Sequence, residues 1–193
     1  RTGDCRIAGT TASLAGIEAG EAGGVDRVLL AYSLALSTGG VPLLYLGDEI
    51  AQLNDYGYTG RAAEAGDSRW VNRPFRDPNA REQARDLSTP AGQVFAGLTR
   101  LLHVRRSSPE FAGGTLIPFH TGITSLVAFQ RPGVGSLVLV LANVGEETVF
   151  VDALTLSGFD GRAQDLLEDR EVSLEAGIRV PAHGIRWLRV SAR

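Results

Sequence analysis

The stretch Gly39-Gly40-Val41-Pro42-Leu43-Leu44-Tyr45-Leu46-Gly47-Asp48-Glu49 decides the fold class of this chain. Residues 41–46 form a short apolar run that ends in two carboxylates, as expected of a buried parallel strand that delivers polar groups to a site. Residues 26–36 carry apolar side chains at helical spacing, and Gly39 and Gly40 supply the stop signal of that helix. A helix, a Gly-Gly turn and a buried strand form an α/β alternation, which predicts a parallel sheet.

The chain after this strand divides into two further regions. Residues 47–87 are a long polar connection, and connections of this length are usually functional. Ser88-Thr89-Pro90 is a typical helix start, and apolar residues then recur at helical spacing as far as residue 105. Beyond residue 111, short runs with partial alternation predict an antiparallel β-sandwich; they lie at residues 115–120, 125–130, 137–142, 148–151, 162–167 and 185–190. A boundary near residues 110–114 therefore separates an α/β domain of residues 1–110 from a β-sandwich of residues 111–193.

The composition favours a globular protein, because 44% of the 193 residues are hydrophobic and 21% are charged. A formal charge of −3 and the lack of a basic run argue against a nucleic-acid partner. The longest apolar run, residues 28–36, is too short to span a membrane, so no membrane partner is expected. Cys5 is the single cysteine and requires no oxidising compartment, which makes the cytoplasm the default location. The chain begins at Arg1 and contains no methionine, which indicates a piece of a longer protein.

Asp48 and Glu49 are candidate functional carboxylates because of their position. Enzymes built on (β/α)8 barrels place their chemistry at the C-terminal ends of the strands, and these two residues follow the predicted strand directly. Alternatively, they anchor the following loop by hydrogen bonding to backbone amides. The sequence leaves both interpretations open.

Arg69 is the candidate substrate-binding residue of the long loop, with Asp67 and Trp70 beside it as pocket or loop support. Aromatic and amide side chains bind sugar rings by stacking and by directional hydrogen bonds. The guanidinium could pair with a carboxylate from another segment and close a pocket; alternatively, it forms an ordinary surface ion pair. The histidines His103, His120 and His183 lie far apart and show no ligand spacing, so no metal site is expected.

Three segments carry a resemblance to a known family. They are residues 2–10, then residues 36–40 continuing through residues 45–49 to Leu53-Asn54-Asp55, and finally Asp67-Ser68-Arg69-Trp70 with Arg73-Pro74. Together they resemble the amylosucrases, sucrose-using transglucosidases of the α-amylase superfamily. The resemblance implies that residues 1–110 are the last part of a (β/α)8 barrel, with helix 7, strand 8, the long strand 8 to helix 8 loop and helix 8. Residues 111–193 would be the C-terminal β-sandwich.

The resemblance also implies a reaction. Glucose would pass from sucrose to an α-1,4-glucan through a covalent glucosyl-enzyme, with release of fructose and without a cofactor. In this family the three catalytic carboxylates belong to barrel strands four, five and seven, so they would lie in the missing N-terminal barrel portion. This chain would supply no catalytic residue and would be inactive by itself. Arg69 is similar to the arginine that pairs with an upstream aspartate and blocks the far end of the glucosyl pocket.

Two alternatives remain open. Another α-amylase superfamily enzyme, such as a trehalose synthase or an α-glucosidase, would share the strand 8 motif and the sandwich. A non-catalytic carbohydrate-binding or structural module is the other. The run at residues 41–46 argues against a module, because a buried strand needs parallel neighbours on both sides and the chain offers no other convincing one.

Overall fold

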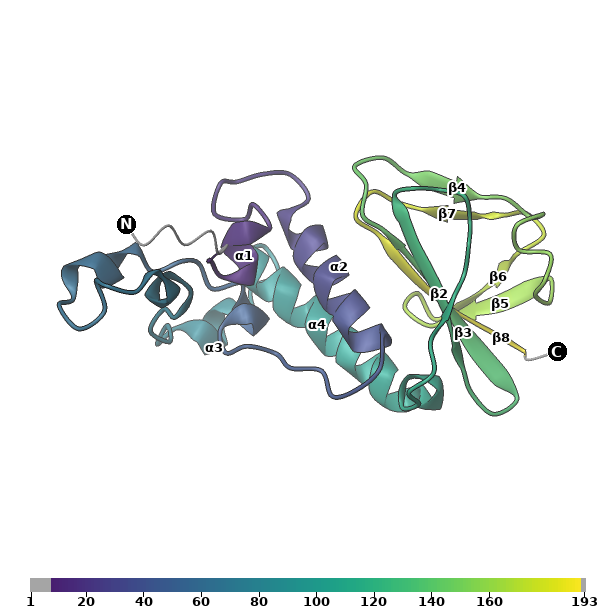
Figure 1. Cartoon of the computed structure of the whole chain (residues 1–193), viewed down its shortest axis with the longest axis horizontal. Coiled ribbons are helices and arrows are strands. Elements are labelled where there is room, and N and C mark those ends of the chain that lie inside the picture. The colour runs from purple at the N-terminus through teal and green to yellow at the C-terminus, as the bar shows by residue number, and fades with distance from the viewer. Residues whose placement is uncertain (1–7, 192–193) are drawn as a thin grey trace. The chain divides into compact units, whose positions relative to one another are not determined.

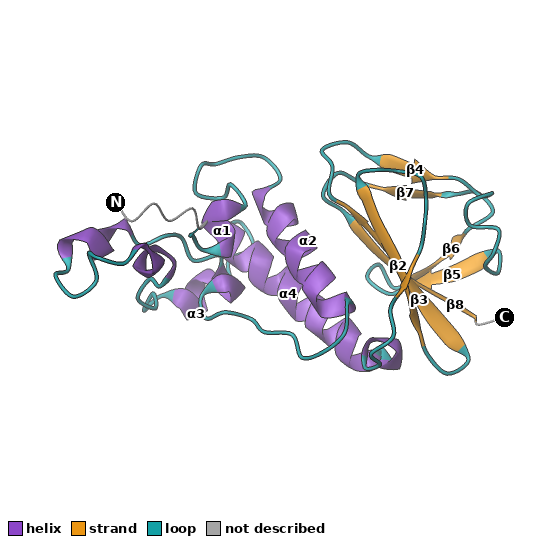
Figure 2. Cartoon of the chain, viewed as in Figure 1, coloured by secondary structure: helices purple, strands orange, loops and turns teal. Residues whose placement is uncertain are grey.

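The computed structural model describes residues 8–191, and the chain divides into two compact units. The first unit comprises Arg1–Val28 and Leu44–Gly97, and the second comprises Leu29–Leu43 and Leu98–Arg193. The described part of the first unit holds helices and loops, whereas the strands belong to the second unit (Figures 1 and 2). The residue 2–7 portion of the first family segment, Cys5 included, lies outside the described residues.

Two long helices form within two residues of their predicted bounds. They are α2 (Gly24–Ser37) and α4 (Pro90–Ser107). Pro90 occupies the first position of α4, and the Thr89 hydroxyl accepts a hydrogen bond from the Gly92 amide at 3.2 Å, which satisfies one of the free amides at the helix start. None of the helices in residues 8–191 combines the length and the apolar character that crossing a lipid bilayer requires.

Short helical turns make up the rest of the first unit. The α-helical turns are α1 (Thr11–Leu14) and α3 (Ala80–Gln83), and the 3₁₀ turns are η1 (Asp48–Ile50), η2 (Tyr56–Gly60) and η3 (Ser68–Asn72). Side chains cap three of these turns, since Thr10 caps α1, Asp55 caps η2 and Asp67 caps η3. The long polar connection predicted for residues 47–87 is therefore a series of short turns, two of which begin at a capping aspartate.

The predicted strand at residues 41–46 does not form in the described structure, which corrects that expectation. Val41 is 98% exposed and Leu43 is 81% exposed. A parallel strand needs neighbours that accept its backbone hydrogen bonds and cover its side chains. Every strand pair among the described residues is antiparallel and lies beyond residue 116, so this run has nothing to pair with.

An antiparallel β-sandwich dominates the second unit, as predicted. Six strands form one sheet in the order β1-β2-β3-β8-β5-β6, and β4 pairs with β7 in a second sheet. Their bounds are β1 (Ile117–Pro118), β2 (Leu126–Pro132), β3 (Ser136–Asn143), β4 (Val149–Val151), β5 (Arg162–Asp165), β6 (Arg170–Ser173), β7 (Ile178–Val180) and β8 (Ile185–Ser191). The strands β6 and β7, which are short and carry charged residues, were not among those predicted.

The central strand β3 is buried on both faces. Leu139 and Leu141 face the core between the two sheets, and the intervening Val138 and Val140 face the opposite side. That opposite side is covered as well, since Trp187, paired with Val140 in the register, contacts Phe111 with ring centroids 4.6 Å apart. Burial on both faces explains why β3 is apolar at nearly every position.

A buried ion pair fixes the segment before the sandwich to β8. Glu110 is 1% exposed and accepts hydrogen bonds from Arg189 Nε at 2.7 Å and Nη2 at 2.9 Å. The Ser136 hydroxyl donates to the same carboxylate at 2.8 Å. Burial alone would raise the pKa of Glu110, but the bonds from Arg189 and Ser136 outweigh it and hold that pKa below its ordinary value.

Two arginines satisfy the carbonyl groups at the end of α2. Arg105 donates to the Leu36 carbonyl and, at 2.9 Å, to the Gly40 carbonyl. The fully buried Arg131 donates to the Thr38 carbonyl at 2.7 Å and to the Gly113 carbonyl. Gly39 has a φ of 104°, and a Cβ there would lie 2.8 Å from Arg131 Nη1. This helix end therefore requires both the left-handed backbone of a glycine and its lack of a side chain.

Candidate functional site

The candidate site begins at the turn after residue 46. Gly47 adopts a φ of 100° and leads into η1, which carries both predicted carboxylates. Glu49 Oε2 accepts a hydrogen bond from the Gly47 amide at 2.7 Å. Asp48 is 6% exposed, and its Oδ2 accepts from the Thr11 hydroxyl at 2.8 Å. In this structure the two carboxylates hold the start of the loop, one against its own backbone and one against α1.

Asn54 connects the exit of this turn to the segment around α1. Its side-chain Oδ1 accepts from the Thr10 amide at 2.7 Å, and its backbone amide donates to the Ser13 hydroxyl at 3.0 Å. Its Nδ2 donates to the Tyr56 hydroxyl at 3.0 Å. The sequence marked Asn54 as part of a motif, but Thr10 and Ser13 lie more than forty positions earlier and no local pattern indicates these two partners.

Asp55 and Arg61 form the polar centre of η2. Asp55 accepts from the Gly57 amide at 2.9 Å and from Arg61 Nη2 at 2.6 Å, while Arg61 also pairs with Glu64. The hydrogen bond from Arg61 holds the pKa of Asp55 below its ordinary value. The Asp55 amide donates to the Val71 carbonyl at 2.8 Å, which joins η2 to η3. Sequence reasoning did not identify Arg61.

Arg69 lies on η3 and binds the carboxylate that caps its own turn. Arg69 Nε is 2.9 Å from both oxygens of Asp67, and Nη2 is 2.6 Å from Oδ2. The Asp67 Oδ1 also accepts from the Arg69 amide at 3.0 Å. The Arg69 side chain is 56% exposed and the Asp67 side chain is 33% exposed. This geometry is bidentate and turned toward solvent, so the guanidinium is presented at the surface of the loop.

Trp70 completes the set of predicted residues on η3. The Arg73 guanidinium lies over its ring, 5.3 Å from the centroid, in a cation–π contact. The structure therefore brings Asp67, Arg69 and Trp70 together on one turn, and places Asp48 and Glu49 on another turn with partners of their own. Within residues 8–191, no group of three or more His, Cys, Asp or Glu side chains could hold a metal ion.

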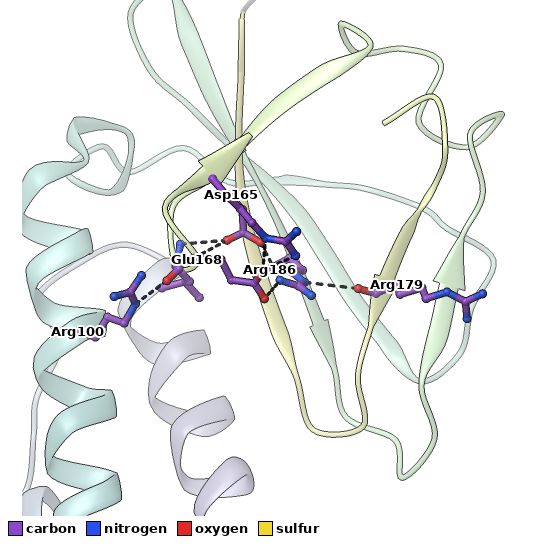
Figure 3. A network of polar contacts seen from close by, with 7 residues as sticks. Arg100, Asp165, Glu168, Arg179 and Arg186 are labelled. Carbon is purple, nitrogen blue, oxygen red and sulfur yellow. Dashed lines mark hydrogen bonds and ion pairs between the residues drawn. The ribbon is translucent and has the colours of Figure 1, made fainter. Parts of the chain in front are cut away.

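A second polar cluster belongs to the sandwich, where it holds the turn between β5 and β6 (Figure 3). The fully buried Asp165 accepts from the amides of Leu167 and Glu168 at 3.0 and 3.1 Å and from Arg186 Nη1 at 2.9 Å. Arg186 also pairs with Glu168, and Arg100 of α4 donates to the Leu167 carbonyl. The polar groups of this cluster bind one another, so we interpret it as a structural device that holds the turn.

The sequence of this chain is similar to part of a known protein. No protein-family model matches the chain. The chain is 28% identical over 136 residues to glucosylglycerate phosphorylase of Escherichia coli, an alignment that covers 69% of this chain and 24% of that protein. The chain thus spans about a quarter of the length of this curated relative.

Solved structures show where the likeness lies. The α-amylase of Geobacillus thermoleovorans, complexed with acarbose, matches with a TM-score of 0.59 and 16% identity over 88% of this chain and 34% of its own. An isomaltulose synthase mutant of Erwinia rhapontici, in complex with its natural substrate sucrose, matches with a TM-score of 0.57 and 18% identity over 86% of this chain and 38% of its own. These matches show a common fold. The chain has the fold of the C-terminal part of α-amylase-family glycoside hydrolases and transferases.

Proposed function

We propose that the chain is the C-terminal portion of a retaining glucosyltransferase that moves glucose from sucrose to an α-1,4-glucan and releases fructose. The observation that carries the proposal is the presentation of Arg69 on η3, a capped turn whose Asp67-Ser68-Arg69-Trp70 sequence resembles the amylosucrase loop. A fold shared with a sucrose-binding isomaltulose synthase supports the choice of donor. The catalytic carboxylates would come from the part of the barrel that precedes this chain.

In the assembled pocket, Arg69 would bind a second carboxylate, either in place of Asp67 or together with it. Its guanidinium is planar and carries five donors, so it can bind a carboxylate from the preceding barrel while one edge stays on Asp67. Such a pair would close the pocket beyond one glucose unit. Asp67 and the cap of η3 would then serve to orient the arginine.

A second candidate is a phosphorylase, in which phosphate instead of a glucan accepts the glucosyl group. The similarity to glucosylglycerate phosphorylase over 69% of the chain favours it. The two candidates share the covalent glucosyl-enzyme and differ in the acceptor. Products therefore distinguish them: fructose with a growing glucan supports the first, and a phosphate-dependent glucose 1-phosphate signal supports the second.

The test is to express the protein with the sequence that precedes Arg1 in its reading frame and to supply sucrose, with and without phosphate. Fructose release with glucan formation, in the absence of phosphate, is expected. The 193-residue chain alone should show no turnover, because it would contribute no catalytic carboxylate. Turnover by the isolated chain, or no release of fructose by the longer protein, would contradict the proposal.

Arg69→Ala in the longer protein tests the assigned residue. We expect kcat/KM for sucrose to fall by about 100-fold or more, because the substrate would be misplaced in an open pocket. Arg162→Ala is the matched control, since Arg162 also forms an exposed ion pair, with Glu171 at 2.7 Å, and lies in the sandwich. This control should stay within about twofold of the parent protein. Equal effects of the two substitutions would show that Arg69 does not line the substrate pocket.

A further inference from the structure

Three arginines line one pocket of the first unit. The pocket has a volume of about 310 Å³ and is lined by Arg76, Arg81 and Arg85 together with Glu49, Ile50, Ala80, Ala84 and Phe95. Arg81 lies in α3, and Arg85 follows one helical turn later, just after the helix ends. The two side chains therefore project from the same side of this segment. All three arginines therefore line one hollow, whose other walls are mostly apolar.

Among the residues that line this pocket, the cations outnumber the anions. Within residues 8–191, the side chains of Arg76, Arg81 and Arg85 form neither an ion pair nor a hydrogen bond, whereas Arg61 and Arg69 in the same loop each bind a carboxylate. The one acidic residue of the lining, Glu49, accepts a hydrogen bond from the Gly47 amide. Three cations against one carboxylate leave a net charge of about +2 at the pocket.

We propose that this arginine pocket binds a phosphate group, either free or carried by a small sugar-sized molecule. A phosphate monoester has a charge near −2 at neutral pH, which matches the excess of the pocket. Planar guanidiniums bind phosphate oxygens through pairs of parallel hydrogen bonds. The floor of Ile50, Ala80, Ala84 and Phe95 gives an apolar contact for a carbon skeleton, and the volume suits a small ligand. The proposal does not depend on the reaction assigned above.

Isothermal titration calorimetry at low ionic strength tests binding on the whole 193-residue chain. The probes are inorganic phosphate, glucose 6-phosphate and glucose. Saturable binding of glucose 6-phosphate that weakens with added salt is expected, and glucose alone should not bind. Binding of inorganic phosphate with equal affinity would identify free phosphate as the source. Failure of both phosphates to bind would overturn the proposal.

Substitutions locate the site. The double variant Arg81→Gln/Arg85→Gln should weaken glucose 6-phosphate binding by about tenfold or more, because two charge-assisted contacts are lost. Arg106→Gln is the matched control, since Arg106 is exposed, lies on α4 outside this pocket and has no partner among the described residues. It should change the affinity by less than about twofold. An equal loss in the control would indicate non-specific attraction and overturn the site.

Chemical protection gives a readout that needs no substitution. Phenylglyoxal modifies accessible arginines, and mass spectrometry identifies which of them react. Glucose 6-phosphate should protect Arg76, Arg81 and Arg85 and leave Arg106 unprotected. Uniform modification with and without the ligand would overturn the proposal, even if the double variant failed to fold.

Discussion

Leu141 and Leu43 are both leucines in short apolar runs, yet the first is fully buried and the second is 81% exposed. The difference lies in their partners. The run that contains Leu141 is β3, and it pairs with β2 on one side and β8 on the other. The run that contains Leu43 has no strand partner among the described residues. Apolar character therefore predicts a tendency to be buried, whereas pairing decides whether burial occurs.

The two units also differ in the interactions that stabilise each of them internally. The sandwich has a continuous core of two sheets, and the buried carboxylates Glu110 and Asp165 are each paired with an arginine of β8. The loop region of the first unit relies on capping side chains and on bonds from polar side chains to the backbone. A region of the second kind has many contacts but little shared core, so its parts are stabilised locally.

The largest expected effect comes from Leu141→Ala compared with Leu43→Ala. The first should lower the free energy of unfolding of the sandwich by about 2–5 kcal/mol, because it leaves a cavity in the core. The second should change it by less than about 0.5 kcal/mol, since its side chain is exposed. Urea unfolding followed by tryptophan fluorescence in a Trp70→Phe background reports the sandwich alone, through the buried Trp187. Similar costs for the two substitutions would break the comparison.

Glu110→Gln should have the next largest effect. It removes the charge that Arg189 binds with two hydrogen bonds and should cost the sandwich about 1–3 kcal/mol. Arg162→Gln, which removes an exposed ion pair with Glu171, should cost less than about 1 kcal/mol. The same fluorescence assay measures both. A cost for Glu110→Gln no greater than that of the exposed pair would show that burial of this pair adds nothing.

Thr89→Ala tests the local stabilisation of the first unit. Loss of the cap on α4 should cost about 1 kcal/mol, because the Gly92 amide loses its partner. Helix content followed by far-ultraviolet circular dichroism during thermal unfolding measures the change, and Thr89→Ser, which keeps the hydroxyl, should restore most of the loss. An equal loss in both variants would mean that the hydroxyl is not the stabilising group.

The pH dependence of the sandwich should show the smallest effect. The pKa of Glu110 is held below its ordinary value of 4.5 in the folded state, so the unfolded chain binds this proton first as the pH falls. The stability that the Glu110 carboxylate contributes is fully present above pH 4.5, and it is lost as the pH drops toward the pKa of the folded state. Urea midpoints measured from neutral to acidic pH should fall less steeply in Glu110→Gln than in the parent chain. Parallel curves would contradict the low pKa.

Local signals in the sequence identified much of this fold. The Thr89-Pro90 start and the Gly39 end of the two long helices depend on neighbouring residues, and the structure confirms both. Six of the eight strands lie in runs that the sequence predicted, whereas β6 and β7 were not predicted. The prediction of a strand at residues 41–46 was wrong for the described structure. A strand needs neighbouring strands, and a single apolar run cannot supply them.

The candidate site was less predictable for a similar reason. Asp67 and Arg69 are two positions apart, so their association is visible in the sequence. Asn54 binds Thr10, 44 positions away, Asp48 binds Thr11, 37 positions away, and the partners of Glu110 lie up to 79 positions away. Contacts at such separations follow from the folded arrangement of the chain. The loop contacts that involve distant residues therefore had to be read from the structure.

The contact between Gly39 and Arg131 has an evolutionary consequence. The guanidinium occupies the space that a side chain at position 39 would need, and it binds the carbonyl group of Thr38 before the turn and that of Gly113 in another segment. A mutation at position 39 would therefore be tolerated only after the arginine had changed, and the arginine could change only if those carbonyl groups found another donor. The two positions, 92 residues apart in the chain, should be inherited together and should covary among related sequences.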